Sequence, residues 1–152
     1  MSLKVEDVMV EDVISVSEEA TVRKVAELMN TNEIGCLVVV KDGKPVGIVT
    51  ETDLVKKVIL ELVDPQETKV GEIMSKHLVV CNPQMDLDKA SKLMRRRRIK
   101  KLPVVEKGRL VGLVTTTDIV RSPEVMKMMI RAIKRSLIKQ IVMSIQEKLE
   151  LP

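Results

Sequence analysis

The 152-residue sequence contains no phenylalanine, tyrosine or tryptophan, only two cysteines and a single histidine. Without aromatic rings it lacks the usual stacking platform for the bases of single-stranded nucleic acid. Two cysteines are too few for a disulfide framework, and nothing in the sequence is typical of a secreted protein. No apolar run approaches the roughly 18 residues that a membrane-spanning helix needs, and the mixed, acidic start is unlike a signal peptide. We therefore expect a cytoplasmic protein without a membrane span.

Motifs of catalysis are also missing. The sequence has no Walker-type phosphate loop and no G-x-S-x-G nucleophile motif. His77 and Cys81 would share one face of a strand, but two ligands do not make a zinc site. Neither Cys36 nor Cys81 has a candidate base beside it. We predict no catalytic residues, no metal site and no catalytic cofactor.

The sequence does contain an internal repeat. A shift of 65 residues aligns residues 4–56 with residues 69–121 without a gap and leaves 18 positions identical. A gapless register of this length indicates one structural unit used twice. The identical positions include Met9/Met74, Leu28/Leu93, Met29/Met94, Val39/Val104, Val40/Val105, Gly43/Gly108, Gly47/Gly112, Thr50/Thr115 and Asp53/Asp118.

Each repeat predicts the element order β-α-β-β-α, hence a mixed α/β (α+β) fold. The patterns in the first repeat predict strands at Val13–Val16, Cys36–Lys41 and Val46–Thr50, with helices at Thr21–Asn30 and Asp53–Leu62. A single unit of about 60 residues would bury only a modest share of its surface, so we expect the pair to fold together. The predicted units are residues 4–63 and 69–121, followed by a helical extension at 122–152.

Both repeats resemble CBS domains. The resemblance rests on a leading V-x-D/E-h-M (where h is an apolar residue), a central L-V-V-V or L-P-V-V, and a closing G-h-V-T-x-x-D, in the same order twice. It implies a Bateman module: two units packed with pseudo-twofold symmetry, two clefts between them, and frequent dimerisation into a disc. It also implies regulatory binding of AMP, ADP or ATP, with S-adenosylmethionine as another possible ligand. The leading hypothesis is therefore a non-catalytic nucleotide or energy sensor that signals to an unknown protein effector by conformational change.

A T-x-x-D motif stands at a strand-to-helix junction in each repeat, at Thr50–Asp53 and at Thr115–Asp118. The pattern matches a capping box, with Thr as N-cap and Asp at the third helical position, and capping alone accounts for both copies. The same groups also suit a nucleotide, because a helix N-terminus favours phosphate and a carboxylate accepts hydrogen bonds from ribose. The resemblance gives Thr50, Asp53, Thr115 and Asp118 these roles, which makes both clefts candidate sites.

The resemblance also supplies residues for the base and the phosphates. Lys100 and Lys101 precede L-P-V-V and would contact phosphates, whereas the matching pair Gly35-Cys36 carries no charge, so we expect unequal sites. Without aromatic residues, the base would be held by aliphatic contacts and backbone hydrogen bonds. Each of the residues expected to enclose it is equally suited to the core: Ile14, Val16, Val79, Cys81, Leu37, Val38, Leu102 and Pro103.

The basic run R-R-R-R-I-K-K at residues 95–101 has other interpretations. Cations at a helix C-terminus suit the helix dipole, so the run is also an ordinary solvated helix end. Six clustered cations can instead neutralise a phosphate backbone. A nucleic-acid-binding protein that uses Arg95–Arg98 and the basic tail is therefore the alternative function, and a scaffold with empty clefts is a third.

The charge is unevenly distributed along the chain. Residues 1–68 carry a net charge of −7, residues 69–120 a net of +7, and residues 121–152 a net of +4. A disc with like units in contact would place like charges together, which disfavours association. We therefore expect a homodimer with head-to-tail packing.

The tail begins with a helix-start signal, Ser122-Pro123, with Ser as cap and Pro at the first helical position. Apolar residues then recur every three or four positions, on a face too wide to be left in water. We expect this helix to pack on the module or on a second chain. A basic amphipathic helix that lies on a membrane or binds a partner protein is the alternative.

Overall fold

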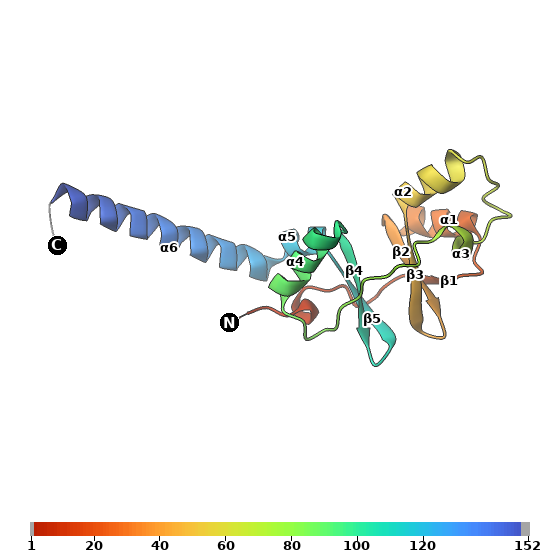
Figure 1. Ribbon diagram of the computed structural model, residues 1–152, viewed down its shortest axis with the longest axis horizontal. Helices are drawn as coiled ribbons and strands as arrows, with labels where there is room; N and C mark the ends of the chain where they lie inside the picture. Colours follow the sequence, from red (N-terminus) through yellow and green to blue (C-terminus); the bar gives the residue numbers. More distant parts are fainter. Residues whose placement is uncertain (1, 150–152) are drawn as a thin grey trace. The chain divides into compact units, whose positions relative to one another are not determined.

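Two β-hairpins with flanking helices and a long C-terminal helix make up the fold in a computed structural model that describes residues 2–149 (Figure 1). The chain consists of two compact units, one ending at Thr115 and the other beginning at Thr116. The first unit contains the whole first repeat and the second repeat as far as the end of its hairpin. Its elements are η1 (Val5–Asp7), β1 (Ser15–Ser17), α1 (Val22–Asn32), β2 (Cys36–Lys41), β3 (Lys44–Thr50), α2 (Glu51–Leu54), η2 (Val55–Ile59), α3 (Val70–Ile73), α4 (Leu87–Arg97), β4 (Lys101–Glu106) and β5 (Arg109–Thr115).

The two hairpins are copies of each other in detail. β2 pairs with β3 and β4 with β5, both antiparallel, and equivalent residues 65 positions apart occupy equivalent register. Each hairpin turns through two residues with positive φ, Asp42-Gly43 in the first and Lys107-Gly108 in the second. This backbone matches the tight turns that favour glycine at the second position. The strands predicted at Cys36–Lys41 and Val46–Thr50 are confirmed, the latter two residues longer.

The first strand differs between the repeats. In the first repeat, β1 pairs in parallel with β2 over three residues. The second repeat has a single bridge between Cys81 and Val104 instead of a described strand. The prediction of a full strand there was wrong. Pro103 replaces Val38 of the first repeat and has no N–H to donate, which shortens the ladder.

The leading segment of each repeat packs against the other repeat. The N–H of Ile48 donates to the carbonyl of Ser75 at 3.0 Å, and Ser75 donates back at 2.9 Å. Val10 and Leu113, which occupy the reciprocal positions, exchange two hydrogen bonds of 2.9 Å. The exchange ties the repeats together in a pseudo-twofold arrangement, as expected from the sequence.

The core of the first repeat includes this exchanged segment. Val70, Ile73 and Met74 of the second repeat pack with Val25 and seven other buried apolar side chains of one cluster. A Cβ at Gly47 would overlap the sulfur of Met74, so glycine is required for this close approach. Aliphatic and Met side chains fill the core that no aromatic residue occupies.

The helix after the second hairpin strand of the first repeat ends earlier than predicted. In the first repeat, the four-residue α2 continues as one π-helical turn, η2, and the chain leaves the helix before Leu62. The prediction of a helix to Leu62 was therefore too long. The equivalent helix α5 (Thr116–Arg121) in the second compact unit ends at Ser122. Ser122 caps the next helix, whose first residue is proline, as predicted.

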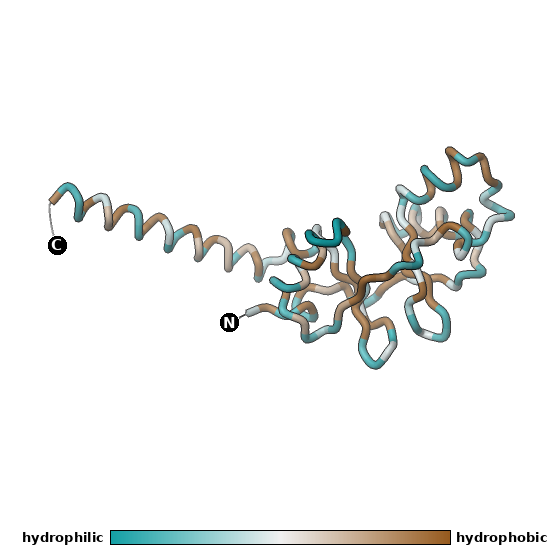
Figure 2. Tube along the Cα trace, viewed as in Figure 1, coloured by the Kyte–Doolittle hydropathy of each residue, from teal (hydrophilic) through white to brown (hydrophobic). Residues whose placement is uncertain are grey.

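The second compact unit consists of α5 and the helix α6 (Pro123–Lys148). No described residue of α6 is buried, although eleven of its large apolar side chains are 44–61% exposed. Figure 2 shows hydrophobic positions along the full length of this helix. Among the described residues, no helix is both long and apolar enough to cross a bilayer.

Candidate ligand-binding pocket

The T-x-x-D motif of the first repeat folds into a capping box. The N–H of Thr50 donates to Oδ2 of Asp53 at 2.8 Å, and the N–H of Asp53 donates to Oγ1 of Thr50 at 3.3 Å. The hydroxyl of Thr50 also lies 3.1 Å from the same carboxylate oxygen. These bonds fix both side chains at the start of α2, as predicted. The next N–H group, that of Glu51, donates to the carbonyl of Gly35 at 3.0 Å, so the cap satisfies most of the N–H groups at the start of the helix.

Lys57 extends this arrangement by one helical turn. Its ammonium lies 3.1 Å from Oδ1 of Asp53 and donates to the carbonyl of Ile73 at 2.8 Å. Asp53 therefore has one oxygen in the cap and the other beside a cation. The sequence analysis did not identify Lys57. Its i,i+4 spacing from Asp53 on a predicted helix was the available signal.

The basic residues of the second repeat reach the site through a helix end. Arg98 follows α4 with a left-handed backbone, and the N–H of Ile99 bonds to the carbonyl of Met94 at 2.9 Å. This C-terminal cap reverses the chain and leads directly into β4 at Lys101. Glu33 occupies the equivalent position after α1. The residue after the helix is therefore a cation, Arg98, in the second repeat and a carboxylate, Glu33, in the first.

One pocket brings the two sets of residues together. Its cavity volume is about 440 Å³, within the range of small-molecule sites. Asp53 is the only carboxylate among the lining side chains, against three cations. The pocket therefore favours anionic ligands. Its lining comprises Ile48, Thr50, Thr52, Asp53, Ser75, Arg98, Ile99, Lys100 and Lys101.

The candidate residues fall into two groups. Thr50, Asp53, Lys100 and Lys101 line the pocket, whereas the residues expected to enclose a base do not. Five of those are buried (Val16, Leu37, Val38, Leu102 and Cys81), as is Pro103, while Ile14 and Val79 are half-buried. Their role in base binding stays a prediction. The lining residues that the sequence analysis missed as ligand contacts are Ile48, Thr52, Ser75, Arg98 and Ile99.

The second T-x-x-D motif divides between the compact units. Thr115 ends β5 in the first unit and Asp118 lies in α5 of the second. Their binding role stays a prediction. Near Gly35, the uncharged counterpart of Lys100, the first unit has a separate hollow of about 480 Å³ with Glu33 and Glu51 in its lining. This hollow is lined by the first repeat alone, so it is not the counterpart of the pocket, and the inequality of the two sites stays a prediction.

The cysteines offer no reactive thiolate at the pocket. Burial raises the pKa of the Cys81 thiol to about 11, so the thiol stays protonated at neutral pH. Cys36 is also buried. Over residues 2–149, no cluster of three His, Cys, Asp or Glu side chains is placed to hold a metal ion.

Comparisons with known proteins agree with the repeat structure. The family model for the CBS domain matches residues 5–60 and again residues 70–125. The CBS domain-containing protein YhcV of Bacillus subtilis is 37% identical over 115 residues, which cover 76% of this chain and 81% of YhcV. The inosine-5'-monophosphate dehydrogenase of Thermoplasma acidophilum is 37% identical over 118 residues, which cover 76% of this chain but only 22% of that enzyme.

A solved structure adds a ligand to the comparison. The CBS domain pair of protein MJ0100, in complex with 5'-methylthioadenosine and S-adenosyl-L-methionine, superposes with a TM-score of 0.72 and 26% sequence identity. The match covers 80% of this chain and 95% of that one. A module with this architecture thus binds adenosyl compounds in that protein.

Proposed function

The chain belongs to the CBS domain family, and on that premise we propose that it is a non-catalytic regulatory module for adenine nucleotides or related adenosyl ligands. The observation that carries the proposal is the joint pocket. Thr50 and Asp53 of the first repeat line it together with Lys100 and Lys101 of the second. A ligand that contacts both sets would join the two repeats.

The groups in the pocket match the parts of a nucleotide. The carboxylate of Asp53 is an acceptor for the two ribose hydroxyls. Arg98, Lys100 and Lys101 offer charge-assisted bonds to phosphate oxygens. The excess of cations favours AMP, ADP or ATP over S-adenosylmethionine, whose sulfonium is positively charged. The ligands of MJ0100 support the adenosyl class.

The exchange of leading segments suggests how binding would be transmitted. Ser75 lines the pocket and is hydrogen-bonded to Ile48 across the two repeats. A ligand held by both repeats favours the arrangement in which its contacts are best formed, and so shifts the population of conformations. A protein effector that reads this arrangement would respond to the concentration of the ligand.

Titration calorimetry with AMP, ATP, adenosine and S-adenosylmethionine tests the proposal. Asp53→Asn keeps an oxygen to cap Thr50 but removes the charge, and we expect binding to weaken by about 1.5–3 kcal/mol. Asp42→Asn is the matched control, because Asp42 is an exposed hairpin residue outside the pocket lining. The absence of binding heat with all four ligands at millimolar concentration would refute the proposal.

A further inference from the structure

The loop after the second helix of the first repeat contains a leucine in an unfavourable position. Leu62 has a left-handed backbone with φ of 55°, and its side chain is 91% exposed. Glycine or asparagine is the usual residue in this conformation. Ile59 and Leu60 beside it are 63% and 69% exposed. Neither local conformation nor burial in the described chain accounts for three large apolar side chains here, so the cluster is a candidate contact surface.

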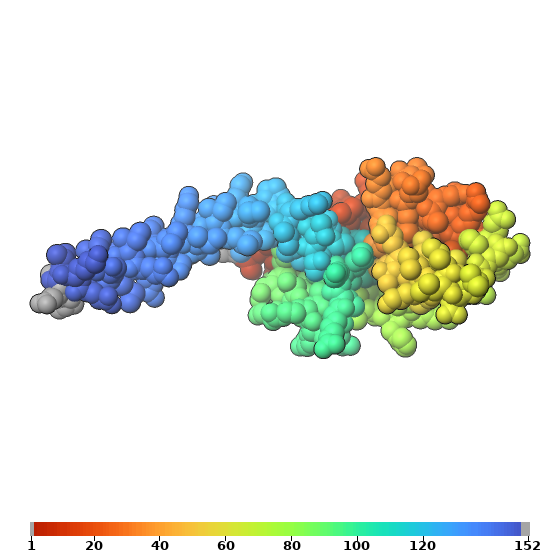
Figure 3. Space-filling view, turned by 90° about the horizontal axis from the view of Figure 1, so that it is seen from above, coloured from red at the N-terminus to blue at the C-terminus, as the bar shows by residue number. Residues whose placement is uncertain are grey.

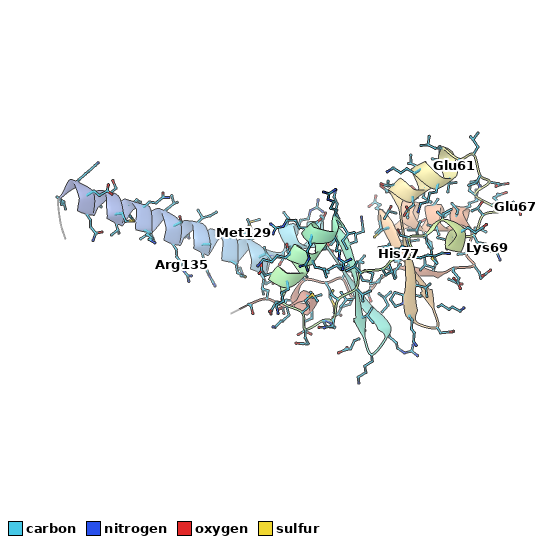
Figure 4. The ribbon with its side chains drawn as sticks, viewed as in Figure 1. Glu61, Glu67, Lys69, His77, Met129 and Arg135 are labelled. Atoms are coloured by element: carbon cyan, nitrogen blue, oxygen red, sulfur yellow. The ribbon has the colours of Figure 1, made fainter. Side chains whose placement is uncertain are left out.

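The same loop is acidic. Residues 59–67 include Glu61, Asp64 and Glu67 and no basic residue. Glu61 and Glu67 lie in this loop in Figure 4, and neither forms an ion pair with a described residue. Atoms of residues near position 60 (yellow in Figure 3) lie on the surface. We call residues 59–67 the apolar–acidic loop.

Helix α6 presents the complementary chemistry. At 100° per residue, one sector about 120° wide contains a row of basic residues followed by a row of apolar ones. No acidic residue occurs between Val125 and Gln146. We call this sector the basic–apolar side. Its members are Lys127, Arg131, Lys134 and Arg135, then Ile138, Ile141, Val142 and Ile145.

The pattern argues for a protein surface rather than a lipid surface. In residues 125–135 most apolar side chains, including Met126, Met129 and Ile133, point away from the basic row, while Met128 and Ile130 flank it. In residues 137–149 most apolar side chains lie on the basic–apolar side, with Leu137 and Met143 outside it, so the main apolar face turns by roughly 160° along the helix. An interfacial helix needs one continuous apolar face to lie on a flat bilayer. A helix with two apolar faces instead fits between protein surfaces.

We propose that the basic–apolar side of α6 docks on the apolar–acidic loop of a second copy of this chain, reciprocally. Arg131 and Arg135 would oppose Glu61 and Glu67, and Ile138 and its apolar neighbours would cover Leu62. Charge complementarity selects this occupant, since a second α6 would bring cations against cations. A twofold axis generates two such contacts, and a stable pair buries about 1,200–2,000 Å² in total. This inference is independent of nucleotide binding.

Charge reversal and rescue test the docking by sedimentation velocity. The wild type should be a dimer at micromolar concentration. Arg131→Glu with Arg135→Glu should raise the dimer dissociation constant at least tenfold, and so should Glu61→Arg with Glu67→Arg. A chain with all four substitutions should dimerise again, because both charges of each pair are reversed. Glu11→Arg with Asp12→Arg, in the same acidic repeat, is the matched control and should leave the dimer intact.

A further variant separates docking from folding. Leu62→Asn removes the apolar side chain but suits the left-handed backbone. It should weaken the dimer at least tenfold without lowering the melting temperature of the monomer, measured below the dimer dissociation constant. A monomeric wild type would overturn the proposal. If the α6 amides of that monomer are protected from hydrogen exchange, α6 packs on its own module instead of on a second copy. A dimer whose dissociation constant does not change on charge reversal in α6 would also overturn the proposal. Binding of the wild-type monomer to phosphatidylserine vesicles, lost on reversal in α6, would show a membrane helix instead.

Discussion

The ammonium of Lys57 connects two structural elements, because it lies 3.1 Å from the Asp53 carboxylate and bonds to the Ile73 carbonyl at 2.8 Å. Asp53 lines the pocket, and Ile73 belongs to the leading segment that the second repeat contributes to the core of the first. Lys57 does not line the pocket itself. It compensates the charge of Asp53 and holds that residue near the exchanged segment.

Lys57→Met should therefore change ligand preference as well as stability. Loss of one positive charge beside the pocket should weaken ATP binding by about 1 kcal/mol, or about fivefold, at low salt. Adenosine has no phosphate, and its affinity should change less than twofold. Loss of the bond to Ile73 should lower the free energy of unfolding by about 1 kcal/mol. Calorimetry and urea denaturation measure the two effects.

Lys56→Met is the control for this prediction. Lys56 is exposed and belongs to the same helical turn, but it forms no ion pair with any residue from 2 to 149. An equal loss of ATP and adenosine affinity in Lys57→Met would contradict a charge effect and indicate general damage to the site.

Substitutions in the basic run should separate mononucleotide from nucleic-acid binding. Lys101 lines the pocket, so Lys101→Ala should weaken ATP binding about tenfold and adenosine binding little. Arg96 is exposed outside the pocket lining, and Arg96→Ala should leave ATP affinity unchanged. A gel-shift experiment with duplex DNA and single-stranded RNA is the counter-test. Tight binding at physiological salt that needs Arg95–Arg98 would favour the nucleic-acid alternative.

Gly47→Ala should destabilise the paired repeats by about 1–3 kcal/mol, the scale of overpacking. The added methyl group would overlap the buried side chain of Met74 and lie 3.1 Å from the Ser75 carbonyl. Gly35→Ala is the control, since its methyl group would meet the Glu51 carboxyl at an ordinary 3.5 Å. Equal midpoints of urea denaturation for the two variants would show that the repeats are not held together at this contact.

Stability should fall in acid partly through two surface ion pairs. Lys69 lowers the pKa of Glu19 below its ordinary 4.5, and Lys4 lowers that of Asp86 below 3.8. Because the folded-state pKa values are lower than the unfolded ones, this stabilisation is complete above the ordinary values. It is lost as the pH falls through the folded-state values. The variant Glu19→Gln with Asp86→Asn should therefore show a shallower decline of stability between pH 5 and about pH 2 in urea denaturation.

Glu19 is exposed and Asp86 is half-buried at the surface, so salt provides the check on this prediction. At 1 M NaCl the difference between the variant and the wild type should largely disappear, because exposed charges are screened. A difference that persists in high salt would have to come from something other than these ion pairs.

The sequence alone determined the repeat, the family and most of the local structure. The register between residues 4–56 and 69–121 implied one unit used twice, and the turn at Asp42-Gly43 and the cap at Thr50 followed from local chemistry. These features depend on a few neighbouring residues, whose preferences are visible without tertiary contacts. The candidate residues Asp53 and Lys101 came from the family resemblance, and both line one pocket, while their role in binding stays a prediction.

Only the tertiary structure decided which residues of the two repeats meet. The exchange of leading segments places Ser75 at the pocket, and the cap after α4 brings Arg98 to it. Lys57 holds Asp53 near the exchanged segment because it bonds to the carbonyl of Ile73, 16 residues further along the chain. Pro103 has no N–H, and this limits the pairing at Cys81 to a single bridge. The effect could be predicted only once the neighbouring strand was known. Hydrophobic periodicity shows which face is buried, but the partner of that face depends on contacts between residues distant in sequence.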